Sequence, residues 1–174
     1  APNCYQEDTG NRYPENEDRV KCRENMLAIL NDPEKALKAI KGGQCDPFEI
    51  TRRLERSNNS SSEDAMLTAQ WNALLKVRIE TIKKMNLKCK TIPVIDTSGS
   101  MGTGAGGSKS KVTCHDVARG MGLFLTELVG KLDPNSPFKD MLISFSTIPT
   151  IHYLEGQPLI DRLKKMQPIV QSTN

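Results

Sequence analysis

The stretch T-I-P-V-I-D-T-S-G-S-M at residues 91–101 constrains the fold more than any other part of the chain. Its apolar residues Ile92–Ile95 predict a short buried strand, which ends abruptly in an acid and two hydroxyls at alternate positions, Asp96, Ser98 and Ser100. Mg²⁺ binds hard oxygen ligands, keeps several waters and commonly uses only one or two protein carboxylates. The stretch therefore predicts a strand that delivers oxygen ligands to a tight loop.

The residues before this stretch predict a mainly helical region. Asp46 as N-cap, Pro47 at the first helical position and Glu49 at the capping-box position open a helix that runs through Leu54. Apolar spacings of three and four predict further helices at 19–30, 34–41 and 63–86. These predictions divide the chain into an irregular arm at 1–18, a helical region at 19–56, a flexible S-N-N-S-S-S linker at 57–62, a long connecting helix at 63–90 and an α/β unit at 91–174.

The helix predicted at 63–86 has an apolar face and a basic face. Its apolar face is predicted to carry Leu67, Trp71, Leu74, Ile82 and Met85. Its basic face is predicted to carry Lys76, Arg78, Lys83 and Lys84. A basic stripe of this size is usually a solvated helix face, and nucleic-acid contact is the alternative interpretation.

The chain after residue 112 predicts a helix, a β-hairpin and a last helix. Thr113 and Asp116 form a capping-box pattern at the start of the first helix. Strands are predicted at 141–146 and 150–154, and their short connection makes them a hairpin with the second strand at the sheet edge. The last helix begins at Pro158. It is predicted to run through Leu159, Ile160, Leu163 and Met166. The residues predicted to be buried are Val117, Met121, Phe124, Leu125, Leu128, Leu132, Leu142, Ile143 and Phe145.

The glycine-rich run G-T-G-A-G-G-S-K-S-K at residues 102–111 satisfies two phosphate-binding patterns only in part. Gly102, Gly104 and Gly107 match G-x-G-x-x-G, but the dinucleotide fingerprint places its first glycine directly at the strand end. In the alternative pattern G-x-x-x-x-G-K-S, Ser108 stands where the lysine must be. We therefore interpret the run as a mobile, solvated excursion.

Asp96 and the two histidines are the candidates for catalysis. Asp96 at a strand end resembles the nucleophile of haloacid-dehalogenase-type phosphatases, but Ser98 occupies the position of the general acid that such chemistry needs. His115 at a helix start and His152 in an edge strand are interpreted as structural or solvent-facing. The sequence therefore favours a protein without enzymatic activity.

Composition narrows the class of protein further. Hydrophobic residues make up 37% of the chain and charged residues 26%, as in ordinary globular proteins, and a net charge of +3 does not by itself argue for nucleic acid. No apolar run approaches about 18 residues and no signal-peptide pattern is present, which predicts neither a membrane span nor secretion. The five cysteines include no C-x-x-C pair, which favours reduced thiols in an intracellular setting.

The run D-T-S-G-S-M, taken with D-V-A-R-G-M-G-L-F-L-T-E-L and M-L-I-S-F-S, resembles a von Willebrand factor A-type (VWA) domain. In that family D-x-S-x-S is the first loop of a metal-ion-dependent adhesion site. The resemblance implies a Rossmann-like sheet with helices on both faces. It also implies that Ser98 and Ser100 bind Mg²⁺ (or Mn²⁺) directly and Asp96 largely through water, with Gly99 shaping the turn. A second-loop threonine and a third-loop aspartate complete the protein's ligands, and a protein partner commonly adds a carboxylate.

A narrower resemblance covers roughly residues 45–174. The runs I-S-F-S-T-I-P-T-I-H-Y-L-E-G, L-I-D-R-L-K-K-M and S-T-N are similar to an uncharacterised intracellular family of plants, fungi, bacteria and large DNA viruses, in which a helical region precedes the A-type domain. By this resemblance Thr173 is the second-loop threonine. The Ro ribonucleoproteins, whose helical repeats bind RNA beside an A-type domain, share the architecture.

The chain departs from this pattern at two places. The loop at 102–111 is longer than the family usually has, and the sequence ends at the second metal loop, before the third-loop aspartate and the later strands. In the A-type strand order 3-2-1-4-5-6 the strand Ile92–Ile95 is central, so we expect either that the protein continues beyond Asn174 or that another chain covers the open edge of this strand. The expected fold is α/β: a Rossmann-like A-type domain, incomplete at the C-terminus and preceded by a small α-helical region.

Together these observations predict a non-enzymatic, Mg²⁺-dependent protein–protein interaction module, intracellular or part of a virion. Its expected metal ligands are Asp96, Ser98, Ser100 and Thr173. Two alternatives stay open: a structural assembly protein, such as a virion component with an incomplete metal site, and a Ro-like protein that binds RNA through the basic helix. Metal content separates the first alternative from the main prediction, and a steep salt dependence of affinity identifies the second.

Overall fold

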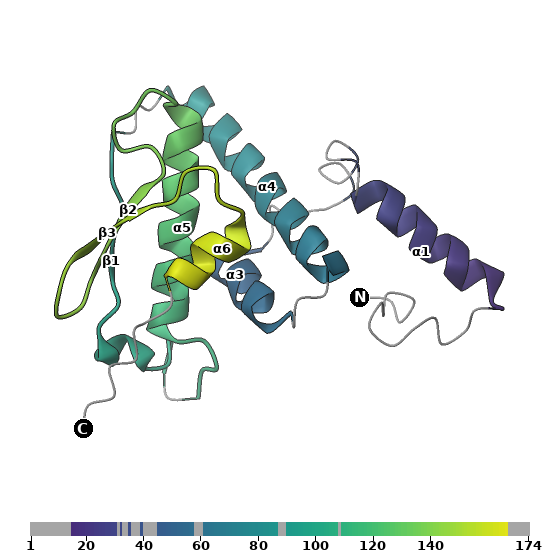
Figure 1. Cartoon of the computed structure of the whole chain (residues 1–174), viewed down its shortest axis with the longest axis horizontal. Coiled ribbons are helices and arrows are strands. Elements are labelled where there is room, and N and C mark those ends of the chain that lie inside the picture. The colour runs from purple at the N-terminus through teal and green to yellow at the C-terminus, as the bar shows by residue number, and fades with distance from the viewer. Residues whose placement is uncertain are drawn as a thin grey trace.

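The chain folds as a mixed α/β protein with a small three-stranded sheet (Figure 1). The structure is a computed structural model that describes residues 15–30, 32, 35, 39, 45–57, 61–86, 90–107 and 109–166. Most of the helix predicted at 34–41 lies outside these residues, as do residues 1–14 of the predicted arm, residues 58–60 of the predicted linker, and Thr173. Within the described part, no helix is both long enough and apolar enough to cross a membrane.

The sheet consists of β1 (Val94–Asp96), β2 (Met141–Phe145) and β3 (Thr150–Tyr153), in the order β1-β2-β3. β2 pairs with β1 in parallel and with β3 in antiparallel orientation, so the predicted hairpin with β3 at an edge is confirmed. The first strand begins at Val94, two residues later than predicted. Among the described strands β1 is the other edge and not a central strand, because β2 alone pairs with it. A neighbour on its second side stays a prediction.

Helix α5 (Cys114–Leu132) connects the two parallel strands and packs on one face of the sheet. Gly122 permits the close approach, because a Cβ there would lie 2.7 Å from Ile95 Cγ2 and 3.0 Å from Leu142 Cδ1. The capping box predicted at its start is confirmed, since Thr113 N–H donates to Asp116 Oδ2 (2.9 Å) and Asp116 N–H donates to Thr113 Oγ1 (3.0 Å).

The predicted buried face of α5 is wrong at two positions. Phe124 and Leu128 are buried as expected, but Met121 and Leu125 are 38% and 41% exposed. Their side of α5 has no covering element among the described residues, whereas the sheet, α3 and α4 cover the rest of the helix. The 3.6-residue period identified residues that share a stripe, but it could not show where the packing partners end.

Helices α3 (Pro47–Arg56) and α4 (Ser61–Lys84) pack against α5 on the side away from the sheet (Figure 1). Trp71 lies at the centre of this layer and meets Phe124 edge to face, with ring centroids 5.4 Å apart, while its Nε1–H donates to Glu127 Oε2 (2.8 Å). Leu67, Trp71 and Leu74 are buried as predicted. Met85 is 63% exposed, contrary to the prediction, because α4 ends at Lys84 and the chain turns away.

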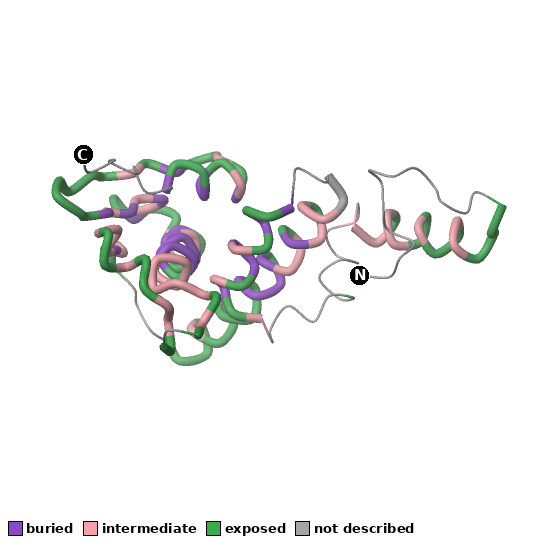
Figure 2. Tube along the Cα trace, turned by 90° about the horizontal axis from the view of Figure 1, so that it is seen from below, coloured by how far each residue is buried: buried purple, intermediate pink, exposed green. Residues whose placement is uncertain are grey.

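The core is continuous across the predicted linker. Ser57 is buried, and its hydroxyl donates to the Leu54 carbonyl (2.9 Å) and contacts the Asp64 carboxylate of α4. Buried residues of α3 and α4 form one apolar cluster with those of α5 and the sheet. Figure 2 shows this concentration of buried residues where the helices meet.

Two further helices flank the core. α6 (Leu159–Lys165) buries Leu159 and Leu163, and the buried Arg162 beside them pairs with Asp140 at 3.1 Å. α1 (Glu17–Leu30) contains no buried residue and contacts α4. The predicted helix at 19–30 is therefore confirmed, although it starts two residues earlier.

The second face of the sheet carries apolar side chains that no described element covers. Val94, Ile151 and Tyr153 are 57%, 50% and 65% exposed, and the helices α3, α4 and α5 lie on the opposite side (Figure 1). The predicted burial of Ile143 and Phe145 is wrong: Ile143 is only partly buried and Phe145 is 41% exposed. Side chains alternate along a strand, so these two point away from the face on which Leu142 contacts α5.

Candidate metal centre

Three oxygen-bearing side chains gather in the loop that follows β1. Asp96 ends the strand, and its Oδ1 accepts a hydrogen bond from the Ser98 N–H (2.8 Å), which folds the chain back as an Asx turn. The short 3₁₀ helix η2 (Gly99–Gly102) then brings the Ser98 and Ser100 hydroxyl oxygens to 3.0 Å from each other. The loop therefore collects one carboxylate and two hydroxyls within five residues.

Strand β2 anchors this loop. Thr97 donates to the Phe145 carbonyl through both its N–H (2.8 Å) and its hydroxyl (3.1 Å), so its side chain is directed at the neighbouring strand. The Met101 N–H donates to the Ser98 carbonyl (3.0 Å), which closes the turn of η2. Thr97 is held on β2, so the side chains of its neighbours Asp96 and Ser98 are the ones available to bind a cation.

The electrostatics keep Asp96 ionised. Its pKa is lowered from 3.8, first by the hydrogen bond from the Ser98 backbone, then by the Ser98 side chain, and further by the nearby His115. Burial lowers the pKa of His115 below 6.5, and Arg119 lowers it further, so this imidazole is mainly neutral at pH 7. The His115 Nε2 is buried and has no hydrogen-bond partner among the described residues.

The donor set fits a hard divalent cation. Asp96 and Ser98 are partly buried and Ser100 is exposed, so the oxygens can be reached from solvent. The residues that the structure describes contain no group of three or more His, Cys, Asp or Glu side chains that could hold a metal. A cation in this loop would thus depend on hydroxyl oxygens and water beside one carboxylate, a combination that suits Mg²⁺ and does not suit Zn²⁺.

The glycine-rich loop after η2, interpreted from the sequence as a mobile, solvated excursion, is held by hydrogen bonds at both ends. Gly104 bridges to Thr113, the Ala105 N–H donates to the Val112 carbonyl (2.7 Å), and the Cys114 N–H donates to the Thr103 carbonyl (2.9 Å). Gly104 is required there, since a Cβ would lie 2.5 Å from the Gly107 carbonyl oxygen. The loop therefore leads directly from η2 into the N-terminus of α5.

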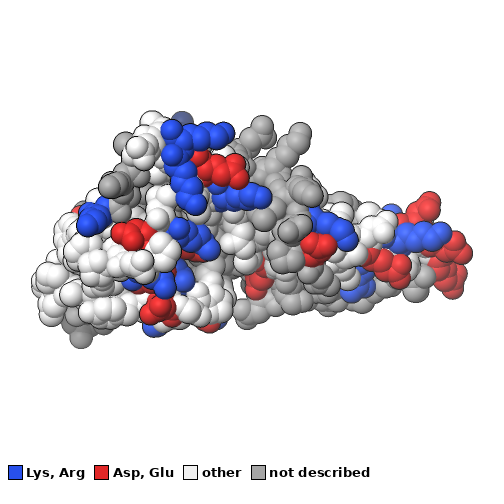
Figure 3. All heavy atoms as spheres, turned by 90° about the horizontal axis from the view of Figure 1, so that it is seen from above, with Lys and Arg blue, Asp and Glu red and all other residues white. Residues whose placement is uncertain are grey.

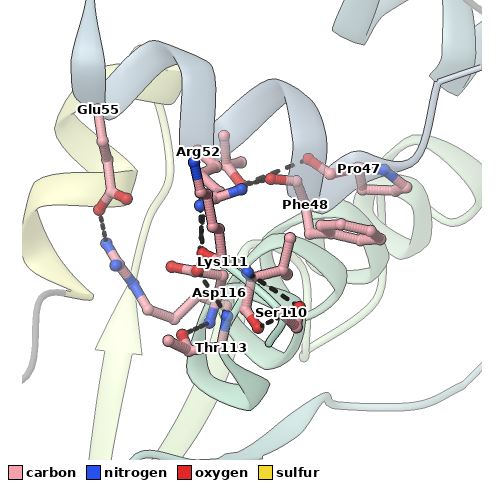
Figure 4. A network of polar contacts seen from close by, with 11 residues as sticks. Pro47, Phe48, Arg52, Glu55, Ser110, Lys111, Thr113 and Asp116 are labelled. Carbon is pink, nitrogen blue, oxygen red and sulfur yellow. Dashed lines mark hydrogen bonds and ion pairs between the residues drawn. The ribbon is translucent and has the colours of Figure 1, made fainter. Parts of the chain in front are cut away.

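Arg52 of α3 ties this loop to the helical layer (Figure 4). Its guanidinium donates to the Lys111 carbonyl and lies 3.6 Å from Asp116 Oδ2, the same carboxylate that caps α5. Close by, Gly120 lets α5 approach α3, because a Cβ there would lie 2.4 Å from the Phe48 Cα. The metal loop, the α5 N-terminus and α3 therefore form one connected unit.

Arg119 is a second connection that sequence reasoning missed. It is 4% exposed, pairs with Glu55 of α3 at 2.6 Å and donates to the Leu163 carbonyl of α6 (2.9 Å). The one signal in the sequence was an arginine within an otherwise small and apolar segment of α5. His152, interpreted from the sequence as structural or solvent-facing, lies 2.7 Å from the Ser144 hydroxyl through its Nε2.

Comparison with known proteins relates the C-terminal part of the chain to one family. Residues 90–174 match the model of the family described as "Domain of unknown function (DUF7788)", which is just under half of the chain and includes the candidate metal loop. No curated protein and no solved structure matches the chain significantly. The α/β unit is therefore similar to that family, and the match assigns it no activity.

Proposed function

We propose that this protein is a non-enzymatic, Mg²⁺-dependent protein-interaction module, with Mn²⁺ as an alternative metal. The observation that carries the proposal is the convergence of an ionised Asp96 with two hydroxyl oxygens 3.0 Å apart on one solvent-accessible loop. These three side chains hold the cation, and Thr173 joins them by resemblance to the A-type domain. Because Mg²⁺ prefers six oxygen ligands, a carboxylate from a protein partner completes the coordination.

The arrangement of the sheet supports a Rossmann-like A-type fold as the finer description. β1 and β2 are parallel and joined through α5, and β3 returns antiparallel at the edge. This matches the 3-2-1 half of the A-type strand order, in which the first strand carries the metal loop at its C-terminal end. The comparison of the fold with the A-type domain is an analogy. The metal proposal does not depend on it, because it rests on the side chains of the loop itself.

Isothermal titration calorimetry of the chain with MgCl₂ and MnCl₂ tests the metal proposal. We expect binding heat for the wild type and none for Asp96→Ala, while Ser98→Ala and Ser100→Ala each weaken binding about tenfold, because each removes one direct ligand. Asp161→Ala, which removes an exposed carboxylate on α6, is the matched control and should bind like the wild type. No heat in the wild type, or equal heats for the two aspartate variants, would contradict the proposal.

One observation favours RNA binding as a second candidate. Lys76, Arg78, Lys83 and Lys84 of α4 are exposed and form no ion pair or hydrogen bond with the described residues. Figure 3 shows basic side chains gathered on the face seen from above, where α4 ends. Phosphate contacts by such cations make affinity fall steeply with salt. A fluorescence titration with single-stranded RNA at 50 and 200 mM salt distinguishes this candidate, since Lys83→Gln with Lys84→Gln should then weaken binding at the lower salt.

A further inference from the structure

A groove along α4 lies apart from the metal loop and shares none of its described lining residues with it. The groove has a volume of about 750 Å³, and sites for small molecules commonly measure about 300–1,000 Å³. Residues of α4 form most of its wall, and one residue each of α1 and α5 complete it. The groove is therefore large enough for a small-molecule ligand.

The part of the groove formed by the first half of α4 is apolar. Between Ala65 and Leu75, α4 contributes no charged residue to the lining. Leu75 is buried, and Ala69 and the last residue of α1, Leu30, are partly buried, so these side chains form a floor rather than a rim. Covering such a floor removes apolar surface from water, which favours a ligand with an apolar part.

The part formed by the second half of α4 is cationic. Lys76 and Lys83 lie seven positions apart on the same side of the helix, and both are exposed and form no ion pair with the described residues. Lys131 of α5 also lines the groove, but it already pairs with Glu127 at 3.4 Å. Glu80 is the one acid in the described lining, and it forms no ion pair with the described residues. Two lysines are therefore available to an anionic group.

Charge and shape together indicate the class of ligand. The helix advances about 16 Å from Ala65 to Lys76, and an extended alkyl chain of about 12 carbons has a similar length. We propose that the groove binds a free fatty acid. Its carboxylate lies at Lys76 and Lys83, and its alkyl chain runs over Leu75 and Ala69 toward Ala65. The site is independent of the metal loop, so either proposal can fail without the other.

Calorimetry with laurate below its micelle concentration tests this assignment. Hexanoate has the same carboxylate on half the chain, and dodecylamine has a chain of the same length with a positive charge. We expect laurate to bind at least about tenfold more tightly than either, because hexanoate leaves the apolar half partly uncovered and the lysines repel dodecylamine. Equal affinities for laurate and dodecylamine, or no binding of laurate, would overturn the proposal.

Two double substitutions on α4 test the cationic end. Lys76→Gln with Lys83→Gln removes both unpaired cations of the groove, so laurate binding should weaken about tenfold or more. Arg78→Gln with Lys84→Gln is the matched control, because these two residues are exposed on the same helix and do not line the groove. The control should change the affinity less than about twofold. All four side chains are exposed, so both variants should fold, and equal losses would contradict the assignment.

Ala69→Glu tests the apolar end. It places a carboxylate on the floor of the groove, where an alkyl chain would desolvate it, so laurate binding should weaken about tenfold or more. Val77→Glu adds the same charge to an exposed position of α4 outside the lining and should weaken binding less than about threefold. Equal effects of the two substitutions would refute the proposed path of the chain. Binding of single-stranded RNA without any binding of laurate would assign the lysines to nucleic acid instead.

Discussion

The two faces of the sheet have opposite environments. On the face toward α5, Ile95, Leu142 and Ser144 are 7%, 0% and 8% exposed. On the other face, the paired residues Val94 and Ile151 flank Ile143 and are half exposed or more. The outer face carries Val94, Ile143 and Ile151, whereas the α5 face includes Ser144 and His152, so apolar composition does not predict which face is covered. We therefore expect the stability of the chain to depend on the α5 face, since the described residues leave the outer face as uncovered apolar surface.

Truncation of a large side chain on each face should give the largest contrast. Leu142→Ala leaves a cavity under α5 and should lower the free energy of unfolding by about 2–5 kcal/mol. Ile151→Ala removes a half-exposed side chain from the outer face and should cost less than about 1 kcal/mol. Urea unfolding of the two variants beside the wild type measures both values. A loss for Ile151→Ala that equals the loss for Leu142→Ala would show that something covers the outer face in solution.

A glycine substitution tests how closely α5 sits on its face of the sheet. Gly122→Ala places a methyl group 2.7 Å from Ile95 Cγ2, and this overpacking should cost about 1–3 kcal/mol, reduced by up to about 1 kcal/mol through the better helix propensity of alanine. Gly102→Ala is the control, because no atom lies within 4 Å of the added Cβ. Thermal unfolding followed by circular dichroism compares the two. A Gly122→Ala protein that melts above the wild type would mean that α5 is less closely packed than the structure shows.

The smallest expected effect is a pH dependence on the α5 face. Burial lowers the pKa of His152 below 6.5, and Lys165 lowers it further. His152 therefore binds a proton more readily in the unfolded chain than in the folded chain. Its contribution to the free energy of unfolding is fully present above pH 6.5 and is lost as the pH falls below 6.5 toward the lower pKa of the folded state. His115 acts in the same direction.

Urea unfolding at pH 7.5 and pH 5.5 measures this loss. His152→Gln cannot bind the proton but offers an amide near the Ser144 hydroxyl, so the variant should lose less stability than the wild type on acidification. If the variant loses as much free energy of unfolding between pH 7.5 and pH 5.5 as the wild type, groups other than His152 cause the loss. Asp96 is not among the candidates in this range, because its pKa lies below 3.8.

The features that sequence reasoning predicted correctly are local ones. The capping boxes at Asp46 and Thr113, the β2-β3 hairpin and the grouping of Asp96, Ser98 and Ser100 all depend on residues within a few positions of one another. Turn and cap chemistry is encoded by neighbouring residues, so the sequence is sufficient for it. The candidate metal loop belongs to this class.

The features that were missed involve residues distant in sequence. Arg52 and Lys111 are 59 positions apart, and Arg119 and Leu163 are 44 positions apart. The exposure of Met121 and Phe145 likewise depends on where the neighbouring elements end.

The sequence by itself thus determined where the helices and strands lie and which oxygen atoms the first loop presents. The tertiary structure decided which apolar stripes are covered and how Arg52 of α3 holds the glycine-rich loop that follows the metal loop. The physical reason is that periodicity and capping act within one element, whereas burial requires a second element to be present. An apolar residue in the sequence indicates only that its burial would be favourable, and it does not show which element buries it.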